Sequence, residues 1–368
     1  MTGIMPTRLP GAPSATLSVD RLAGVARAER CDGHGLLGQT GHMQLITADG
    51  PLPSPARVEP PDRPTVRVGL VQHRWRPDTE ELARELHEAI GRAAGAGAEV
   101  VFLPEITLLR YPADVRATGR PGDSAEELGS GPSYRLAARA AAEFGVHVHI
   151  SVYRRADGPD GLGLNTAILV APDGSIIGHT DKLHIPITAG YYEDTYFRPG
   201  PAESAYPVHE VAGVGGMRLG MPTCWDEWFP EVARAYSLGG AEVLVYPTAI
   251  GSEPDHPEFD TAPLWRQVIV ANGITAGTFM VVPNRVGSEG TLTFYGSSFI
   301  SDPYGRVLVE APRDEEAVLV ADLDLAQRRD WLTLFPFLRT RRPDTYGALV
   351  EPVDRHRPLG DDGPAGGA

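Results

Sequence analysis

Residues Leu219–Glu231 read LGMPTCWDEWFPE, and the fold of the chain can be worked out from this stretch outward. The run Met217–Pro222, apolar apart from Arg218, ends two residues before the cysteine and has the length of a buried strand. Apolar residues then recur at helical spacing from about Glu231 to Leu238. We therefore expect Cys224 near a strand-to-helix turn, where backbone N–H groups can point at a reacting oxygen.

Two charged residues also come directly after predicted strands. Glu105 follows the apolar run Val100–Leu103, and Lys182 follows the strand that ends near His179. A carboxylate, an ammonium group and a thiol, each just past a strand, suggest a single site.

Strand and helix patterns alternate from Val66 onward, which favours parallel strands with helices outside. Asp173-Gly174 and the Asp302–Gly305 turn each separate two apolar runs and predict hairpins, which favour antiparallel edges. Helices are predicted at Thr79–Ala96, Tyr134–Phe144, Glu231–Leu238, Ala262–Asn272 and from Leu325. The combination predicts an α/β fold with mixed sheets.

The bulk composition excludes several classes of function. The chain has 368 residues, and its 33 basic and 48 acidic residues give a net charge of −15. Such a charge argues against nucleic acid and against an anionic membrane surface as partners. Cys31 and Cys224 are the only cysteines, which is typical of a reducing cytoplasm and leaves no cysteine-rich metal cluster. We expect no metal, no cofactor and a cytoplasmic location.

The two ends of the chain differ in composition from its centre. Residues 1–64 are rich in Gly, Pro, Ala and Arg and are expected to form a disordered extension. Residues 65–350 are expected to form the folded domain, and residues 351–368 a flexible tail. Cys31 lies in the extension and is interpreted as an ordinary free thiol.

The three residues can carry out amide-type hydrolysis. A thiol needs activation near neutral pH, and Glu105 could take its proton. Lys182 could favour the thiolate and stabilise an oxyanion, with the N–H of Trp225 as a second donor. Taken singly, each residue has an ordinary structural interpretation: a core cysteine, a helix-capping glutamate and a solvated lysine.

The sequence resembles the nitrilase, or carbon–nitrogen hydrolase, superfamily. The segments that carry the resemblance are LPE at 103–105, DKLHIP at 181–186 and TCWDEWFPE at 223–231. Four further segments are similar to the N-carbamoylputrescine amidase branch: GYYEDTYF at 190–197, YPTAIGSEP at 246–254, TFYGSSF at 293–299 and RRPDTY at 341–346.

This resemblance implies a four-layer α-β-β-α sandwich over about Val66–Val350. It implies Glu105 as base, Lys182 as oxyanion lysine, Cys224 as nucleophile and Glu193 as a supporting second glutamate. It also implies a homo-oligomer in which roughly Gln327–Tyr346 reaches a neighbouring subunit. Candidate substrate contacts beside these segments are Tyr111, Tyr191, Trp228, Glu253 and Trp265.

The substrate stays open at this point. Hydrolysis of an N-carbamoyl amine such as N-carbamoylputrescine requires a carboxylate for the distal ammonium, with Glu253, Asp255, Glu258 and Asp260 as candidates. β-Ureidopropionase activity requires a cation instead, with Arg110, Arg198, Arg266 and Arg285 as candidates. Another aliphatic amidase and a non-catalytic binding protein are further alternatives. Sequence alone also leaves open a Cys–His mechanism, since His184 could share the side of the chain that Lys182 occupies.

Overall fold

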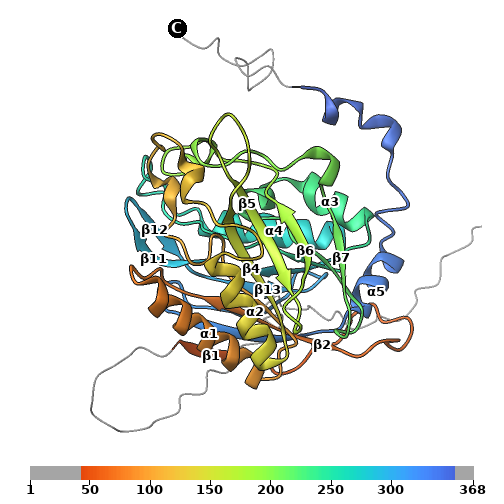
Figure 1. The fold of residues 1–368 in the computed structure, drawn as a ribbon. Coiled ribbons are helices and arrows are strands. Elements are labelled where there is room, and N and C mark those ends of the chain that lie inside the picture. The colour runs from red at the N-terminus through yellow and green to blue at the C-terminus, as the bar shows by residue number, and fades with distance from the viewer. Residues whose placement is uncertain (1–42, 353–368) are drawn as a thin grey trace, which may run out of the picture.

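The computed structural model describes residues 43–352, which form two β-sheets flanked by helices (Figure 1). The first sheet has the order β1 (Gln44–Thr47), β15 (Ala317–Leu323), β2 (Val66–Gln72), β3 (Val100–Phe102), β4 (His147–Arg154), β5 (Leu164–Val170) and β6 (Ile176–Asp181). The second has the order β14 (Val307–Glu310), β13 (Phe299–Ser301), β10 (Phe279–Val282), β9 (Val243–Val245), β8 (Met217–Gly220) and β7 (Val208–Val211). A separate ribbon pairs β11 (Val286–Glu289) with β12 (Leu292–Tyr295).

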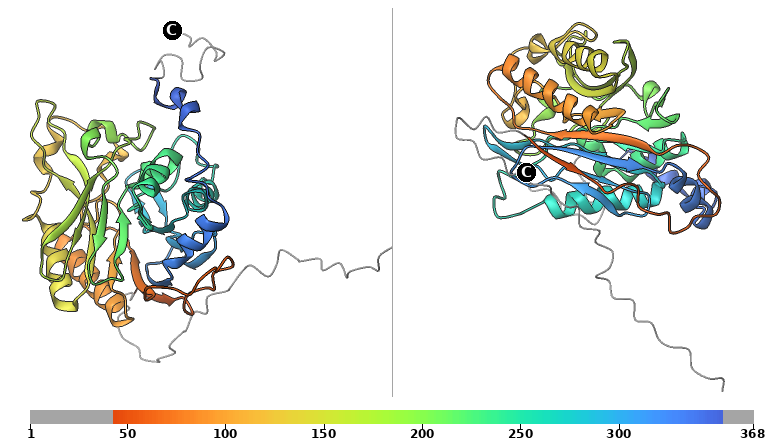
Figure 2. Two further views of the ribbon diagram at one scale, coloured as in Figure 1. Left: turned by 90° about the vertical axis from the view of Figure 1, so that its right-hand side faces the viewer. Right: turned by 90° about the horizontal axis from the view of Figure 1, so that it is seen from below.

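The helices cover the outer faces of the sheets. They are α1 (Thr79–Gly95), α2 (Pro132–Phe144), α3 (Pro230–Leu238), α4 (Ala262–Ala276) and α5 (Ala326–Leu334). Helices α1 and α2 pack on the first sheet, and α3 and α4 pack on the second. One apolar layer, with side chains such as Phe102 and Leu219, fills the space between the sheets. The predicted four-layer α-β-β-α sandwich is confirmed, and its layers are seen edge-on in Figure 2.

Local chemistry explains where the helices begin and end. The carboxylate of Asp78 accepts hydrogen bonds from the backbone N–H groups of Glu80 and Glu81, which caps the start of α1. Helix α2 begins with Pro132 and ends at Gly145, whose φ of 68° is favourable for glycine. Both predicted hairpins are also present, as the antiparallel pairs β5–β6 and β13–β14 at sheet edges.

The prediction of a disordered extension is wrong for residues 43–64. Strand β1 pairs in parallel with β15 at the edge of the first sheet. Ser54 and Arg57 both contact Asp330, and Arg63 pairs with Glu242. The four-residue strand has little periodicity of its own, and its partner lies some 270 residues away along the chain, so local patterns do not reveal it. Residues 1–42, with Cys31, and residues 353–368 of the predicted tail lie outside the described residues.

The sheets bring the three candidate residues to loops at strand ends. Glu105 follows β3, Lys182 follows β6, and Cys224 follows β8 after a short connection. Strands β2, β3 and β4 run parallel to one another, as do β8, β9 and β10, so within each set the carboxyl ends share an edge. In the part of the chain that the structure describes, no helix is long and apolar enough to span a bilayer.

We expect two buried histidines to weaken the fold in acid. His73 and His149 are fully buried, and burial lowers the pKa of each to about 3. Unfolded histidine titrates near pH ~6.5, so below that pH the unfolded chain binds protons that the folded chain cannot. Stability is therefore full above pH ~6.5 and falls toward pH ~3, by about 1.4 kcal/mol per pH unit for each histidine.

Chemical denaturation of His149→Leu between pH 7 and pH 4 checks this expectation. The variant should show a shallower loss of unfolding free energy with falling pH than the parent protein. His179→Gln is the control, because His179 is exposed. Equal slopes for His149→Leu and the parent would contradict the prediction.

Candidate active site

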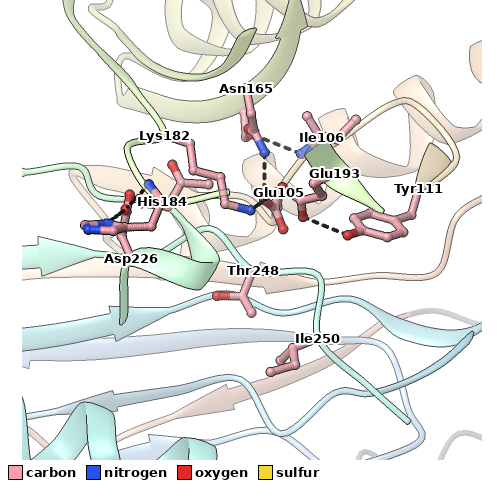
Figure 3. Close-up of polar contacts among 12 residues, drawn as sticks. Glu105, Ile106, Tyr111, Asn165, Lys182, His184, Glu193, Asp226, Thr248 and Ile250 are labelled. Carbon is pink, nitrogen blue, oxygen red and sulfur yellow. Dashed lines mark hydrogen bonds and ion pairs between the residues drawn. The ribbon is translucent and has the colours of Figure 1, made fainter. Parts of the chain in front are cut away.

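Lys182 lies at the centre of a buried polar cluster (Figure 3). Its Nζ is 2.8 Å from Glu105 Oε1 and 2.6 Å from Glu193 Oε2. Tyr111 donates its hydroxyl hydrogen to the other oxygen of Glu193 at 2.7 Å. All four side chains are almost completely inaccessible to water. One ammonium group therefore holds two carboxylates in fixed positions.

The carboxylate of Glu105 is held on one side and unpartnered on the other. Asn165 Nδ2 donates to Oε1 at 2.7 Å, the same oxygen that contacts Lys182. Oε2 is buried and has no hydrogen-bond partner among the described residues. A buried carboxylate oxygen without a partner is uncommon, and it is what a general base needs in order to accept a proton.

Arg285 fixes the backbone that carries Glu105. Its guanidinium donates to the main-chain oxygens of Glu105 at 3.1 Å, of Ile106, and of Leu109 at 2.6 Å. Glu289 balances the charge through contacts of 2.7 and 2.9 Å. Ile106 has a φ of 45°, which is strained for a β-branched residue, so the arginine holds a conformation that the chain would not adopt alone.

Cys224 opens the short 3-10 helix Cys224–Trp228, and its own φ is 41°. Its N–H donates to Pro247 O at 3.0 Å, which anchors the turn to the end of β9. Asp226 Oδ2 accepts from the backbone N–H of Thr223 at 3.0 Å, which stabilises the first turn. The predicted strand-to-helix setting is confirmed, and the positive φ is the kind of strain that clusters at functional sites.

The charges around the thiol set its resting state. Burial and the charge of Glu105 raise the pKa of Cys224 well above its usual range, although Lys182 lowers it. Burial lowers the pKa of Lys182, but Glu105 and Glu193 outweigh burial and hold that pKa well above the usual range. Lys182 thus acts on the pKa of the thiol in the predicted direction, but burial and Glu105 outweigh its effect.

His184 belongs to a different contact from Lys182. Its Nδ1 lies 2.7 Å from Asp226 Oδ1, its backbone N–H donates to the same oxygen at 2.9 Å, and its ring stacks on Phe229. Figure 3 shows His184 directed toward Asp226, away from the end of Lys182 that meets Glu105. The geometry therefore favours a lysine-based site over a Cys–His pair.

The predicted substrate contacts fall into two groups. Tyr191 is buried, accepts from Gly251 N at 3.0 Å, and has its pKa raised by burial and by nearby charges that include Glu253 and Cys224. Glu253 and Trp228 are half-buried, and Trp228 packs beside Trp225. Tyr191, Glu253 and Trp228 remain candidates for contact with substrate. Trp225 remains a candidate for contact with an oxyanion.

Tyr111 and Trp265 have other partners. Tyr111 supports Glu193, as described above. Trp265 is fully buried, and its indole N–H donates to Glu227 at 2.7 Å. We therefore reassign both from substrate contact to support of a neighbouring carboxyl group.

Sequence reasoning missed Asn165 and Glu227. Asn165 stands in a predicted strand beside the hairpin, where an asparagine among apolar residues is the only signal. Glu227 lies within the segment TCWDEWFPE, where nothing in the local pattern distinguishes it from its neighbours. Among residues 43–352, no group of three His, Cys, Asp or Glu side chains could hold a metal ion.

The carbon–nitrogen hydrolase family model matches residues 67–332, and the chain belongs to that family. It is 33% identical over 290 residues to a citrullinase of Francisella tularensis, covering 77% of this chain and 98% of that protein. It is 37% identical over 227 residues to an N-carbamoylputrescine amidase of Arabidopsis thaliana, covering 60% of this chain and 73% of that protein.

Solved structures agree on the fold. A carbon–nitrogen hydrolase from Helicobacter pylori G27 superposes with a TM-score of 0.70 at 28% identity, covering 79% of this chain and all of that chain. An amidase from Nesterenkonia sp. AN1, at 23% identity, has a TM-score of 0.61 over 82% of this chain and all of that chain. The chain is therefore an enzyme of the nitrilase superfamily.

Proposed function

We propose that this enzyme hydrolyses the terminal ureido group of an N-carbamoyl amine such as N-carbamoylputrescine, releasing ammonia, carbon dioxide and the free amine. The observation that carries the proposal is the buried cluster in which Lys182 joins Glu105 to Glu193, beside Cys224. The relatives named citrullinase and N-carbamoylputrescine amidase support a ureido substrate.

The proposed reaction assigns each residue one role. Glu105 takes the thiol proton through its free oxygen while Cys224 attacks the carbonyl carbon. Lys182 and the N–H of Trp225 stabilise the oxyanion that forms. Glu105 returns the proton to the departing nitrogen, and water then cleaves the thioester-like intermediate.

Charge pairing supports a cationic rather than an anionic substrate tail. The four arginines that could bind a carboxylate already have acidic partners: Arg110 with Asp114, Arg198 with Asp160, Arg266 with Glu310 and Arg285 with Glu289. Glu253 forms no ion pair within the described residues, and the hydroxyl of Thr261 is its side-chain contact, at 3.4 Å. Asp260 is paired with Arg313, and Asp255 and Glu258 are exposed to solvent, so the half-buried Glu253 is better placed for an ammonium.

The test is ammonia release from N-carbamoylputrescine, citrulline and N-carbamoyl-β-alanine. Citrulline resembles N-carbamoylputrescine with a carboxylate added beside the amine. We expect the first compound to be the best substrate and N-carbamoyl-β-alanine the worst. The reverse order would favour β-ureidopropionase activity.

Glu253→Gln should raise KM for N-carbamoylputrescine by about tenfold, because a half-exposed charged hydrogen bond contributes on the order of 1.5 kcal/mol. Asp255→Asn is the matched control, since Asp255 is exposed in the same loop. Steady-state kinetics of both variants decide the point. An unchanged KM in Glu253→Gln would remove this residue from the substrate site.

Assembly and location form part of the same proposal. The residues after α5 extend away from the two sheets (Figure 2). Phe335, Leu349 and Val350 in this part of the chain, and Leu334 at the end of α5, are exposed apolar residues, which suits contact with a second subunit. We place the homo-oligomer in the cytoplasm, where free thiols such as Cys224 persist.

A further inference from the structure

Glu227 is a buried carboxyl group that the proposed reaction does not use. It lies in the 3-10 helix three residues after Cys224, and 1% of its surface is exposed. Trp265 Nε1 donates to its Oε1 at 2.7 Å, and Asn272 Nδ2 donates to its main-chain oxygen at 2.9 Å. Within residues 43–352, no lysine, arginine or histidine forms an ion pair with it.

The two contacts of the Thr248 hydroxyl group bear on the protonation state of Glu227. The threonine hydroxyl has one hydrogen, and it is placed to donate to Tyr246 O at 2.8 Å. The same hydroxyl oxygen also lies 3.3 Å from Glu227 Oε2. The single hydroxyl hydrogen could be shared between these two acceptors, but a hydrogen on Glu227 gives each contact a hydrogen of its own. A carboxylic acid supplies it, with Oε1 accepting from Trp265 and Oε2 donating to Thr248.

The surroundings also disfavour a charge on Glu227. Burial raises the pKa of Glu227 well above its usual range, and Glu105 adds to the rise, while Trp265, Lys182 and Thr248 oppose it. An anion here would in turn raise the pKa of the Cys224 thiol. Four titratable groups on other elements interact electrostatically with Glu227: Glu105, Lys182, Tyr246 and Tyr295.

Helix α4 is built to hold this group. Trp265 and Asn272 are seven residues apart and therefore lie on the same face of the helix. Trp265 donates to the side chain of Glu227, and Asn272 donates to its main-chain oxygen. Two hydrogen bonds therefore join α4 to the 3-10 helix. Thr248, on the segment after β9, contacts the other oxygen of the Glu227 carboxyl group.

We propose that Glu227 is a neutral carboxylic acid and a positioning residue, which ties the turn carrying Cys224 to α4 and Thr248 without placing a negative charge beside the thiol. The proposal rests on the proposed function for the role of Cys224. The protonation state of Glu227 can be tested without any activity.

Kinetics test the positioning role through a pair of variants. Glu227→Leu removes both hydrogen bonds of the side chain and should lower kcat at least tenfold. Glu227→Gln can accept from Trp265 and donate to Thr248 as the neutral acid does, so it should restore at least a third of the parental kcat, with the same pH profile. A glutamine variant as poor as the leucine variant, or one with a raised KM for N-carbamoylputrescine alone, would show that the charge is needed and overturn the proposal.

Thermal unfolding tests the protonation state. A carboxyl group that stays neutral in the folded state holds a proton that the unfolded chain releases above pH ~4.3, so parental stability falls as pH rises. Glu227→Gln has no such proton to release. The difference between its Tm and the parental Tm should therefore shift in favour of the variant as the pH rises from 5 to 8. A constant Tm difference, or a glutamine variant that does not fold, would overturn the proposal. If the parent protein releases no ammonia from any ureido compound, the proposed function fails, while this measurement still decides the state of Glu227.

Discussion

Cys224→Ala should abolish ammonia release from the best ureido substrate while leaving the fold intact. The thiol is the one nucleophile in the described part of the chain that sits beside an unpartnered buried carboxylate oxygen and an ammonium group. Alanine removes the sulfur atom but keeps the backbone of the 3-10 helix. Loss of a nucleophile removes the covalent route entirely, so activity should fall to the background rate.

Two control variants sharpen the Cys224 experiment. Cys224→Ser should be almost as inactive, because a hydroxyl is a far weaker nucleophile with a base positioned for a thiol. Cys31→Ala should keep full turnover. Thermal melts of all three proteins separate lost chemistry from lost folding. Retained turnover in folded Cys224→Ala would rule out the thiol mechanism.

Lys182→Ala should lower turnover by at least about 10²–10³, the loss typical of removing one oxyanion donor. The alanine also leaves Glu105 and Glu193 without their shared cation, so the carboxylates would repel each other and shift. Breaking a buried ion pair typically destabilises by about 3–5 kcal/mol, so turnover must be measured on protein shown to be folded. Lys182→Arg should fail as well, because a planar guanidinium does not fit between two oxygens that a compact ammonium holds at 2.8 and 2.6 Å.

His184→Asn is the matched comparison for the lysine variants. His184 contacts Asp226 and Phe229, and an asparagine side chain can still donate to Asp226. We expect this variant to retain most of its turnover. An inactive His184→Asn together with a nearly normal Lys182→Ala would replace the lysine mechanism with a Cys–His one.

The local sequence pattern predicted that Glu105, Lys182 and Cys224 each lie just after a strand. Glu105, Lys182 and Cys224 each follow an apolar run, and such runs form strands whose ends can be placed without knowing the rest of the fold. The hairpin that leads to Lys182 was predicted because Asp173-Gly174 allows a tight turn. The resemblance then joined the three strand ends into one site.

Contacts between distant segments could not be predicted in the same way. The sequence suggested Arg285 as a ligand for a substrate carboxylate, whereas it clamps main-chain oxygens some 180 residues earlier. The sequence suggests Trp265 as a substrate contact, but its indole N–H donates to Glu227, which lies in a different helical segment. In both cases the side chain has several plausible partners, and only the packing of α4 and of the β11–β12 ribbon selects one.

The central claim is that Cys224 attacks the carbon of the substrate with help from Glu105 and Lys182. It is tested most directly by treating the protein with fluoroacetamide and mapping the modified peptide by mass spectrometry. The account predicts addition of one acetamide group to Cys224 with loss of fluoride, protection by N-carbamoylputrescine, and much slower modification in Lys182→Ala. Modification of Cys31 at the same rate, or no protection by any ureido substrate, would contradict it.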